Sequence, residues 1–291
     1  MKSQSLDLEA LDRPHDASAV PPSNGPPFRA DYHVHTKWCN HAAGEMREYV
    51  RAALAHGLTE IGFAEHMPIT IPLEEKLYLS RDEVPLFADE AHRLQDEYAG
   101  RINILIGAEC DFAPGQEAEI EAVITACPFD YVYGAIHFID GWSHDNPNYQ
   151  DRWREVDVAA VYRRYYALLE QAARSGFYDI IAHFDLVKKF GHQPHEDVCE
   201  AEGDAANTVA RAGMTVEINT AGYDVPAAEQ YPSARILRLL RERNVPICFG
   251  SDAHCPEHVA RHFDKARGLA RSLGWTAVAA YRARQRFERP L

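Results

Sequence analysis

Short, mostly apolar runs recur along this chain, and most of them end in histidine or an acidic residue. The seven runs that we predict as strands cover residues 31–35, 60–64, 102–108, 131–136, 179–182, 215–218 and 246–249. Runs of this length are typical of parallel strands that are buried on both faces. Longer amphipathic stretches separate them, so the pattern predicts repeated β-α units.

The helices that we predict occupy residues 45–56, 115–126, 156–175, 196–212, 233–243 and 263–272. The first of them stops at Gly57, a residue that suits a helix C-terminus. Seven strands are one fewer than the eight of a standard TIM barrel. We therefore predict an α/β fold of one domain, a distorted TIM-like (β/α)7 barrel, in preference to a doubly wound open sheet.

A length of 291 residues suits one large barrel domain. Residues 1–28 have no periodic apolar pattern and are rich in proline near their end, so we predict a flexible N-terminal extension there and the barrel over residues 29–291. Two long connections, residues 68–81 and 138–153, leave the carboxyl ends of strands. Loops at that rim usually carry function, and the second is expected to cover a small polar substrate.

Nine possible metal ligands lie in or just after these strands. Alternation along a strand places the imidazoles of His33 and His35 on one face, about 7 Å apart, where both can reach one ion. In a barrel the carboxyl ends of all strands meet at one rim, so the remaining ligands can converge there as well. The predicted set, which points to a multinuclear metallohydrolase, is His33, His35, His41, His66, Glu109, His137, His183, Asp252 and His254.

The motifs that contain these ligands resemble those of the PHP (polymerase and histidinol phosphatase) superfamily. They are Asp31-x-His33-x-His35, Glu65-His66, Gly107-x-Glu109, His137, His183 and Ser251-Asp252-Ala253-His254. The segments 131–138, 183–190, 217–222 and 231–233 are similar to the monofunctional histidinol-phosphatase branch. This resemblance spans residues 31–274 and implies a (β/α)7 barrel, a trinuclear metal site and hydrolysis of phosphomonoesters.

The resemblance also implies how three divalent ions are held. His33, His35, Glu109 and Asp252 would bind the first ion, Glu109 would bridge to a second ion bound by His137 and His183, and the third would take His41, His66 and His254. Zinc, iron and manganese all suit such nitrogen-rich ligands, and the residue types do not choose among them.

The expected reaction is hydrolysis of L-histidinol phosphate to L-histidinol and phosphate, by attack of a metal-bridging hydroxide on phosphorus. Glu109, Asp252 and His254 are the expected catalytic residues. Substrate contacts are predicted at Glu65, Lys188, Asn219 and Tyr223, with Lys189 as a further candidate for phosphate. Relatives often carry basic residues just after the Asn-Thr-x-Gly run, whereas here residues 223–225 are Tyr-Asp-Val.

The formal net charge of −14 argues against nucleic acid or an anionic membrane as a partner, and it would also repel a phosphorylated substrate. The small phosphorylated molecule that we expect as a partner is implied by the resemblance. Ions bound by the ligand set would reverse the charge locally. No signal-peptide pattern or membrane-spanning apolar run is present, and the six cysteines form no C-x-x-C pair. We therefore expect reduced thiols and a cytoplasmic location.

Three other functions are alternatives to hydrolysis of histidinol phosphate. A PHP phosphoesterase acting on nucleotides would use the same ligands, although no basic, aromatic-lined tract suits long nucleic acids. A catalytically silent PHP module that binds a partner would not need every ligand. An amidohydrolase-type deaminase would need a ligating lysine in mid-barrel, which nothing in the sequence supplies.

Overall fold

The computed structural model describes residues 28–69, 71 and 76–291. The predicted N-terminal extension therefore lies outside the described residues, apart from Phe28. In the described part, none of the helices combines the length and the apolar character that crossing a membrane requires. All six cysteines are free thiols.

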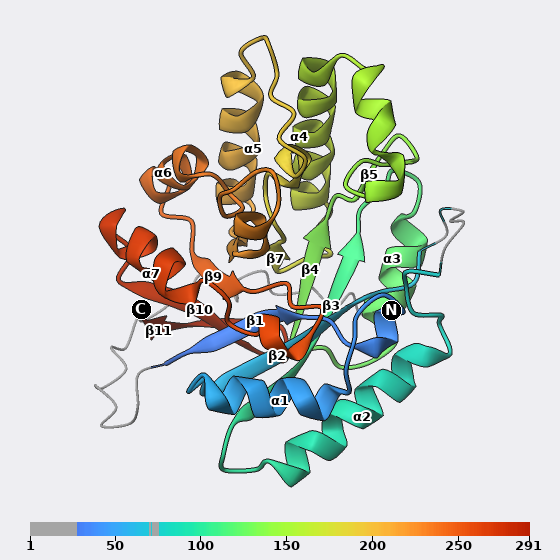
Figure 1. Ribbon diagram of the computed structural model, residues 1–291, viewed down its shortest axis with the longest axis vertical. Coiled ribbons are helices and arrows are strands. Elements are labelled where there is room, and N and C mark those ends of the chain that lie inside the picture. Colours follow the sequence, from blue (N-terminus) through green and yellow to red (C-terminus); the bar gives the residue numbers. More distant parts are fainter. Residues whose placement is uncertain (1–27, 70, 72–75) are drawn as a thin grey trace, which may run out of the picture.

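Seven parallel strands form the central sheet in the order β1-β2-β3-β4-β7-β8-β9 (Figure 1). Their bounds are β1 (Ala30–Val34), β2 (Glu60–His66), β3 (Asn103–Asp111), β4 (Tyr131–Ala135), β7 (Ile180–Ile181), β8 (Thr215–Asn219) and β9 (Ile247–Gly250). Each corresponds to a predicted strand, shifted by no more than three residues at either end. The predicted distorted TIM-like barrel is confirmed.

The last strand reaches the first one only at the carboxyl end of the barrel. Val34 forms an isolated parallel bridge with Ala253, just beyond β9. The backbone N–H of His35 donates to the carbonyl of Ala253 at 2.9 Å, and that of Ala253 donates to the carbonyl of His33 at 3.3 Å. These bonds nearly close the sheet and join the segment that contains Asp252 and His254 to β1.

Seven α-helices pack around the sheet, on its outer side (Figure 1). They are α1 (Met46–Ala55), α2 (Glu83–Glu97), α3 (Glu117–Ile124), α4 (Val158–Ser175), α5 (Cys199–Arg211), α6 (Ala234–Glu242) and α7 (Phe263–Ser272). All six predicted helices are present, and α2 was not predicted. Local capping fixes their ends: the Asp157 carboxylate accepts from two backbone N–H groups at the start of α4, and Gly176, at φ 76°, ends it.

A C-terminal hairpin, which was not predicted either, covers the amino-terminal end of the barrel. It consists of β10 (Ala277–Arg282) and β11 (Gln285–Pro290). Tyr281 is buried there against Tyr32 and Tyr131, and its hydroxyl lies 2.6 Å from the hydroxyl of Thr215. The hairpin thus forms a second apolar core and leaves the carboxyl end of the barrel free for the site.

Short irregular elements follow the carboxyl ends of the strands and build the rim. They are the 3-10 turns η1 (Lys37–Cys39), η2 (Pro147–Arg154), η3 (Leu186–Lys188), η4 (Ala221–Asp224) and η5 (Pro256–His258), and the small hairpin of β5 (Phe138–Ile139) and β6 (Trp142–Ser143). The long connection predicted at residues 138–153 contains the small hairpin and most of η2. The connection predicted at residues 68–81 lies partly outside the described residues.

Candidate metal centre and active site

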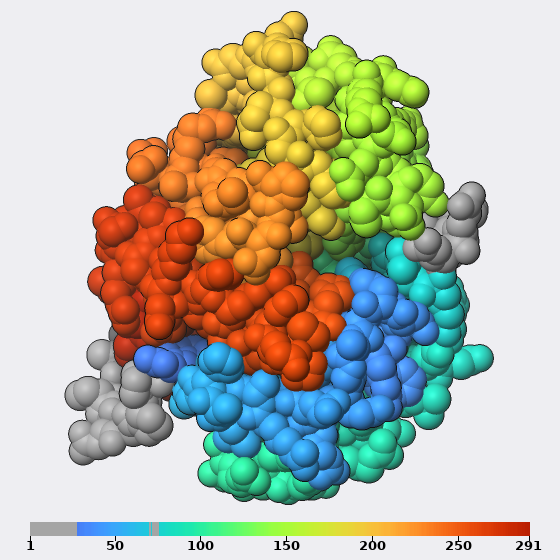
Figure 2. Space-filling view, in the orientation of Figure 1, coloured from blue at the N-terminus to red at the C-terminus, as the bar shows by residue number. Residues whose placement is uncertain are grey.

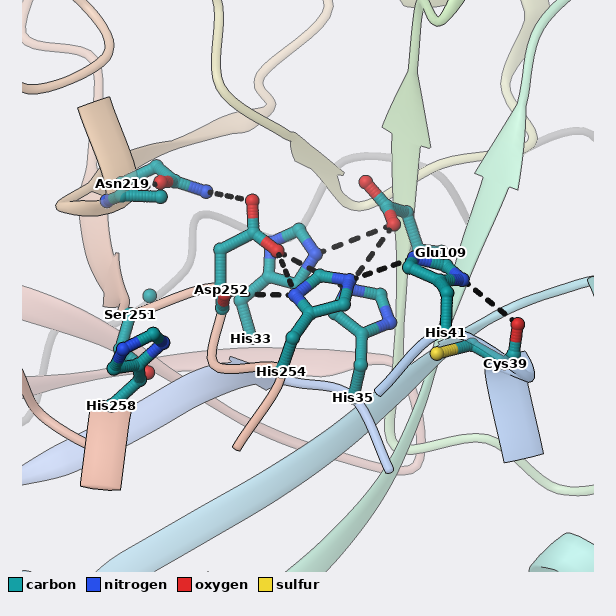
Figure 3. Close-up of polar contacts among 12 residues, drawn as sticks. His33, His35, Cys39, His41, Glu109, Asn219, Ser251, Asp252, His254 and His258 are labelled. Carbon is teal, nitrogen blue, oxygen red and sulfur yellow. Dashed lines mark hydrogen bonds and ion pairs between the residues drawn. The ribbon is translucent and has the colours of Figure 1, made fainter. Parts of the chain in front are cut away.

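The structure brings all nine predicted metal ligands together at the carboxyl end of the barrel. Figure 3 labels six of them, which are His33, His35, His41, Glu109, Asp252 and His254. His33, His35, Glu109 and His183 are no more than 1% exposed, and His66 and His137 are also buried. His41 reaches the same place from the loop after η1, where its Nε2 lies 2.9 Å from Nε2 of His254. The prediction that these side chains converge is therefore correct in geometry.

Glu109, at the end of β3, lies at the centre of this cluster. Its Oε2 is 2.8 Å from Nδ1 of His66, 3.4 Å from Nε2 of His33 and 3.5 Å from Nε2 of His35. Its other oxygen, Oε1, is 2.8 Å from Nε2 of His183 and 3.7 Å from Nε2 of His137. The two carboxylate oxygens thus face two separate groups of imidazoles, which is the geometry of a bridging ligand.

Carboxylates outside the ligand set orient the histidines. Oε1 of Glu217 lies 2.7 Å from Nδ1 of His33, and Oε2 accepts the backbone N–H of His183 at 2.9 Å. A hydrogen bond at one ring nitrogen fixes the orientation and tautomer with which the other nitrogen meets a metal. Gly250 makes the first contact possible, because a Cβ at that position would lie 1.9 Å from Oε1 of Glu217.

Asp111 orients His137 in the same way. Its carboxylate oxygens lie 3.1 and 3.2 Å from Nδ1 of His137, and one of them also accepts the backbone N–H of that residue at 3.0 Å. Burial alone would lower the pKa of His137, but Asp111 and Glu109 outweigh it and raise that pKa to about 10. The negative charge of Asp111 and Glu109 therefore favours a positive charge at His137, whether a proton or a metal ion supplies it.

Asp252 sits in a strained turn after β9. Its φ of 51° lies in the left-handed region, which non-glycine residues adopt rarely and mostly at functional sites. Its Oδ1 is 3.4 Å from Nε2 of His35, and its Oδ2 accepts from Nδ2 of Asn219 at 3.2 Å. Asn219 therefore holds the carboxylate of Asp252 in position and is itself fully buried.

Asp31 holds the same turn from below. Its carboxylate accepts from the backbone N–H of Ser251 at 2.9 Å, from the Ser251 hydroxyl at 2.5 Å and from the backbone N–H of Ala260 at 2.9 Å. Burial raises the pKa of Asp31 to about 6, although these hydrogen bonds oppose the rise. Asp31, part of the first motif, thus fixes the loop of Asp252 and does not face the ligands.

Several buried ligand atoms have no hydrogen-bond partner among the described residues: Nε2 of His33, both ring nitrogens of His35, Nδ1 of His66, Nδ1 of His183 and Oε2 of Glu109. Buried polar atoms without partners are rare in native proteins, and each needs an explanation. Most of them belong to side chains whose ligand atoms lie within 4.8 Å of one another, in the groups His33-His35-Asp252, His35-His66-His254 and His66-Glu109-His137. The donor set therefore fits bound divalent cations, which would satisfy these atoms.

Two of the proposed ligands, Glu109 and His41, have the charge state that metal binding requires. Burial would raise the pKa of Glu109, yet His33, His66 and His137 keep it well below its usual value. Burial lowers the pKa of His41 to about 4, with His66 and His35 adding to the effect. Glu109 is thus ionised and His41 is a neutral imidazole at pH 7, as ligands must be.

A pocket of about 390 Å³ opens onto this cluster. Its apolar wall includes Tyr78, Phe138, Leu186, Val225 and Tyr231, and its polar wall comes mainly from the connection over residues 138–153, where Ser143, Asp145, Asn146 and Asn148 line it. Besides histidines, the lining cations are Lys189 and Arg261. The size and the mixture of apolar and polar groups suit a small polar metabolite.

The residues predicted to contact substrate lie outside this lining. Glu65 is fully buried, accepts from the backbone and hydroxyl of Thr36 at 2.7 and 2.6 Å, and faces Nδ1 of His35. Lys188 donates to Asp185 and Glu229 at 2.9 Å each.

Tyr223 donates to Gln230 at 2.6 Å and lies under Lys265. Asn219 holds Asp252 in position, and Glu65, Lys188 and Tyr223 likewise make hydrogen bonds within the protein around the site. The geometry gives none of the four a direct place in the pocket.

Two cationic side chains, Lys189 and Arg261, line the pocket. Lys189, which was a secondary candidate for phosphate, lies 3.1 Å from Asp145. Burial would raise the pKa of Asp145, but Lys189 and His137 outweigh it and hold that pKa below its usual value. Arg261 was not predicted. It donates to the backbone carbonyls of Ser251 and Asp252 at 3.0 and 3.2 Å, and no sequence signal marks it.

A (β/α)7 barrel whose rim gathers nine histidine and acidic side chains suited to metal binding is typical of a metal-dependent hydrolase. The family model described as "PHP domain" matches residues 31–221, and this chain belongs to that family. A Deinococcus radiodurans protein named "probable histidinol-phosphatase" is 40% identical over 248 residues, which cover 85% of this chain and 95% of the relative. The histidinol-phosphatase of Lactococcus lactis is 27% identical over 260 residues, covering 87% of this chain and 94% of the relative.

A solved structure shares the fold. The crystal structure of histidinol phosphate phosphatase from Lactococcus lactis, which contains zinc, L-histidinol and phosphate, superposes with a TM-score of 0.78 at 24% identity. The match covers 90% of this chain and all of that one. It supports the barrel assignment over nearly the whole described chain.

Proposed function

We propose that this protein is a metal-dependent phosphomonoesterase that hydrolyses L-histidinol phosphate to L-histidinol and phosphate. The observation that carries the proposal is the central position of Glu109, whose two carboxylate oxygens face two groups of inward-facing imidazoles. The 40% identity to the Deinococcus radiodurans protein over 95% of its length supports the substrate. The activity belongs to the biosynthesis of histidine.

The ligand set would hold three ions. His33, His35 and Asp252 would share one ion with Glu109, and Glu109 would share a second with His137 and His183. His41, His66 and His254 would hold the third. The distances leave one alternative, because the ligand atoms of His66 also group with those of Glu109 and His137.

Bound divalent ions supply positive charge for the phosphoryl oxygens and lower the pKa of coordinated water. The residues of the chain position the ligands and the substrate around that charge. Glu217 and Asp111 orient His33 and His137, and Asn219 and Asp31 fix the loop of Asp252. These contacts make the site rigid before substrate binds, which is what electrostatic stabilisation of a developing charge requires.

The far wall of the pocket suits the rest of L-histidinol phosphate, which carries an ammonium group and an imidazole ring. Asp145 is ionised and lines the pocket, so it is our candidate partner for the cationic end of the substrate. Tyr78, Phe138 and Tyr231 provide apolar surface for the ring. Lys189 lies beside Asp145 at 3.1 Å and offsets part of its charge.

A phosphate-release assay tests this function. The protein reconstituted with zinc, manganese or iron is given L-histidinol phosphate, AMP and glucose 6-phosphate at equal concentrations. We expect a kcat/KM for L-histidinol phosphate at least a hundredfold above the others. A comparable preference for AMP would instead establish a nucleotide phosphoesterase, and absence of any turnover would favour a silent PHP module.

A further inference from the structure

A second cavity, of about 270 Å³, shares Arg261 with the catalytic pocket but is otherwise separate from it. It lies where the start of α7 meets the chain just beyond α1. In Figure 2 the orange-red atoms of the segment that leads into α7 lie directly against the blue atoms around α1. Six of the residues that line the cavity are titratable or permanently charged: Arg29, His56, Arg261, His262, Asp264 and Arg267.

The charge of this cavity is opposite to that of the chain. Three arginines line it against one carboxylate, that of Asp264, in a protein whose formal net charge is −14. Among the residues that the structure describes, the only other acid paired with these groups is Asp224, which lies 3.2 Å from Arg261 and 2.8 Å from His262. Arg29 and Arg267 therefore remain without a carboxylate partner among the described residues, and the cavity attracts anions.

Arg267 is the most buried of the three arginines that line this cavity. Its side chain projects from the second turn of α7 and is 7% exposed, yet none of the described residues accepts a hydrogen bond from its guanidinium. The guanidinium carbon lies over the aromatic ring of Phe249, 5.6 Å from its centre. Burial lowers the pKa of Arg267, and Arg271 and Arg29 add to that effect. A buried cation without a counterion is unfavourable, so an anion in the cavity would relieve this cost.

The start of α7 adds a second attraction for an anion. The helix begins at Phe263 after His262, whose side chain makes no capping hydrogen bond; the N–H of Phe263 donates to the carbonyl of Ala260 at 3.2 Å. Uncapped N–H groups and the helix dipole favour negative charge at this end of a helix. Arg267 and the start of α7 line the same cavity, so both can act on one ligand there.

We propose that this cavity is a second anion site, which binds a tetrahedral phosphate group outside the catalytic centre. Its volume is just below the roughly 300–1,000 Å³ of pockets for drug-sized ligands, which suits inorganic phosphate or a small phosphate ester. Arg29, Arg267 and the start of α7 bind the oxygens, and Arg261 links the site to the carbonyl of Asp252. The site does not depend on the proposed reaction.

Isothermal titration of the metal-loaded protein with inorganic phosphate tests this inference. The wild type is expected to bind two phosphates, one at the ions and one in the cavity, and Arg267→Gln only one. Arg238→Gln, which removes an exposed arginine of α6, is the matched control and should bind two. If the catalytic assignment fails, the counts become one and zero, so the two failures are distinguishable. An unchanged count in Arg267→Gln overturns the second site.

Two further measurements separate binding from a structural role of Arg267. Arg29→Gln, a change at an exposed residue, should weaken the second phosphate at least tenfold. In phosphate-free buffer, Arg267→Gln should melt at the same temperature as the wild type or higher, because it removes an unpaired buried charge; a lower melting temperature would contradict the proposal. Methylphosphonate in place of phosphate distinguishes a site for esters, which binds both, from one for the free ion, which binds phosphate alone.

Discussion

Nδ1 of His33 lies 2.7 Å from Oε1 of Glu217, and both side chains are fully buried. Burial would lower the pKa of His33, but Glu217 and Glu109 raise it well above its usual value. Because Nδ1 is fixed in this way, Nε2 is left to face Glu109. Glu217 thus determines how a ligand on β1 is presented, although it is not itself a ligand.

Replacing Glu217 by Gln should weaken metal binding without removing a ligand. Loss of a carboxylate that orients a ligating histidine typically costs 10- to 100-fold in metal affinity or activity. The measurement is metal content after dialysis against a graded chelator, with kcat determined at saturating metal. Glu200→Gln, at an exposed position of α5, is the control. Wild-type metal affinity in Glu217→Gln would show that His33 needs no such support.

Glu109→Gln should abolish turnover and leave the barrel folded. The amide keeps the size of the side chain but loses the charge that faces both groups of imidazoles. We expect kcat to fall by at least about a thousandfold, the scale seen when a group central to transition-state charge is removed. Circular dichroism checks the fold, and Glu121→Gln, exposed on α3, serves as the control. Retained activity would exclude a bridging role.

Removing the metal should lower stability as well as activity. Without ions, Nε2 of His41 and Nε2 of His254 lie 2.9 Å apart, and six ligand atoms are buried without partners. A ligand present at about 100 times its Kd stabilises the native state by about 2.7 kcal/mol. For a chain of this size that corresponds to a melting temperature lower by about 5–10 °C after chelation. Returning zinc or manganese should restore both readouts, and unchanged melting would contradict the metal centre.

The sequence was sufficient to predict the strands, and the convergence of the nine proposed ligands, for one physical reason. Each ligand other than His41 is attached to the end of a strand or to the loop just after it, and the ends of parallel strands must meet. The local sequence pattern around His33, Glu109 and Asp252 therefore predicts that these residues, far apart in the chain, lie close together in space. His41, which lies on the loop after η1, is the exception, because no strand fixes its position.

Substrate contacts could not be predicted in this way, because they depend on which way a side chain faces on an irregular rim. Lys188 and Lys189 are neighbours in the chain, yet the turn of η3 buries the first against Asp185 and directs the second into the pocket. Arg261 belongs to a loop without any motif. Its position depends on contacts with the carbonyls of Ser251 and Asp252, which sequence patterns do not encode.

The C-terminal hairpin also escaped prediction, and its contribution to stability can be measured. Tyr281 is 2% exposed, packs on Tyr32 and Tyr131, and shares a hydrogen bond with Thr215. Truncating a buried aromatic residue costs about 3–5 kcal/mol, so Tyr281→Ala should lower the free energy of unfolding by about that amount in urea titrations. Tyr281→Phe, which loses only the hydrogen bond, should cost about 1 kcal/mol. Equal losses in the two variants would mean that packing of the ring is unimportant.

His144, which is not one of the proposed metal ligands, should make the stability of the protein depend on pH. It is 1% exposed, Nε2–H donates to the carbonyl of Ile136 at 2.9 Å, and burial lowers the pKa of its imidazole to about 4. The unfolded chain binds the proton near pH 6.5, so this histidine costs nothing above that pH. Its cost grows as the pH falls from 6.5 to 4 and is constant below.

His144→Gln should therefore lose less stability than the wild type on acidification. The difference between the two free energies of unfolding should change by about 2–4 kcal/mol between pH 7 and pH 4, in favour of the variant. Denaturant titrations of the metal-free proteins at several pH values measure it, since metal release would otherwise mask the effect. The exposed His92→Gln of α2 should follow the wild-type curve. A difference that does not depend on pH would mean that His144 is not held neutral by its burial.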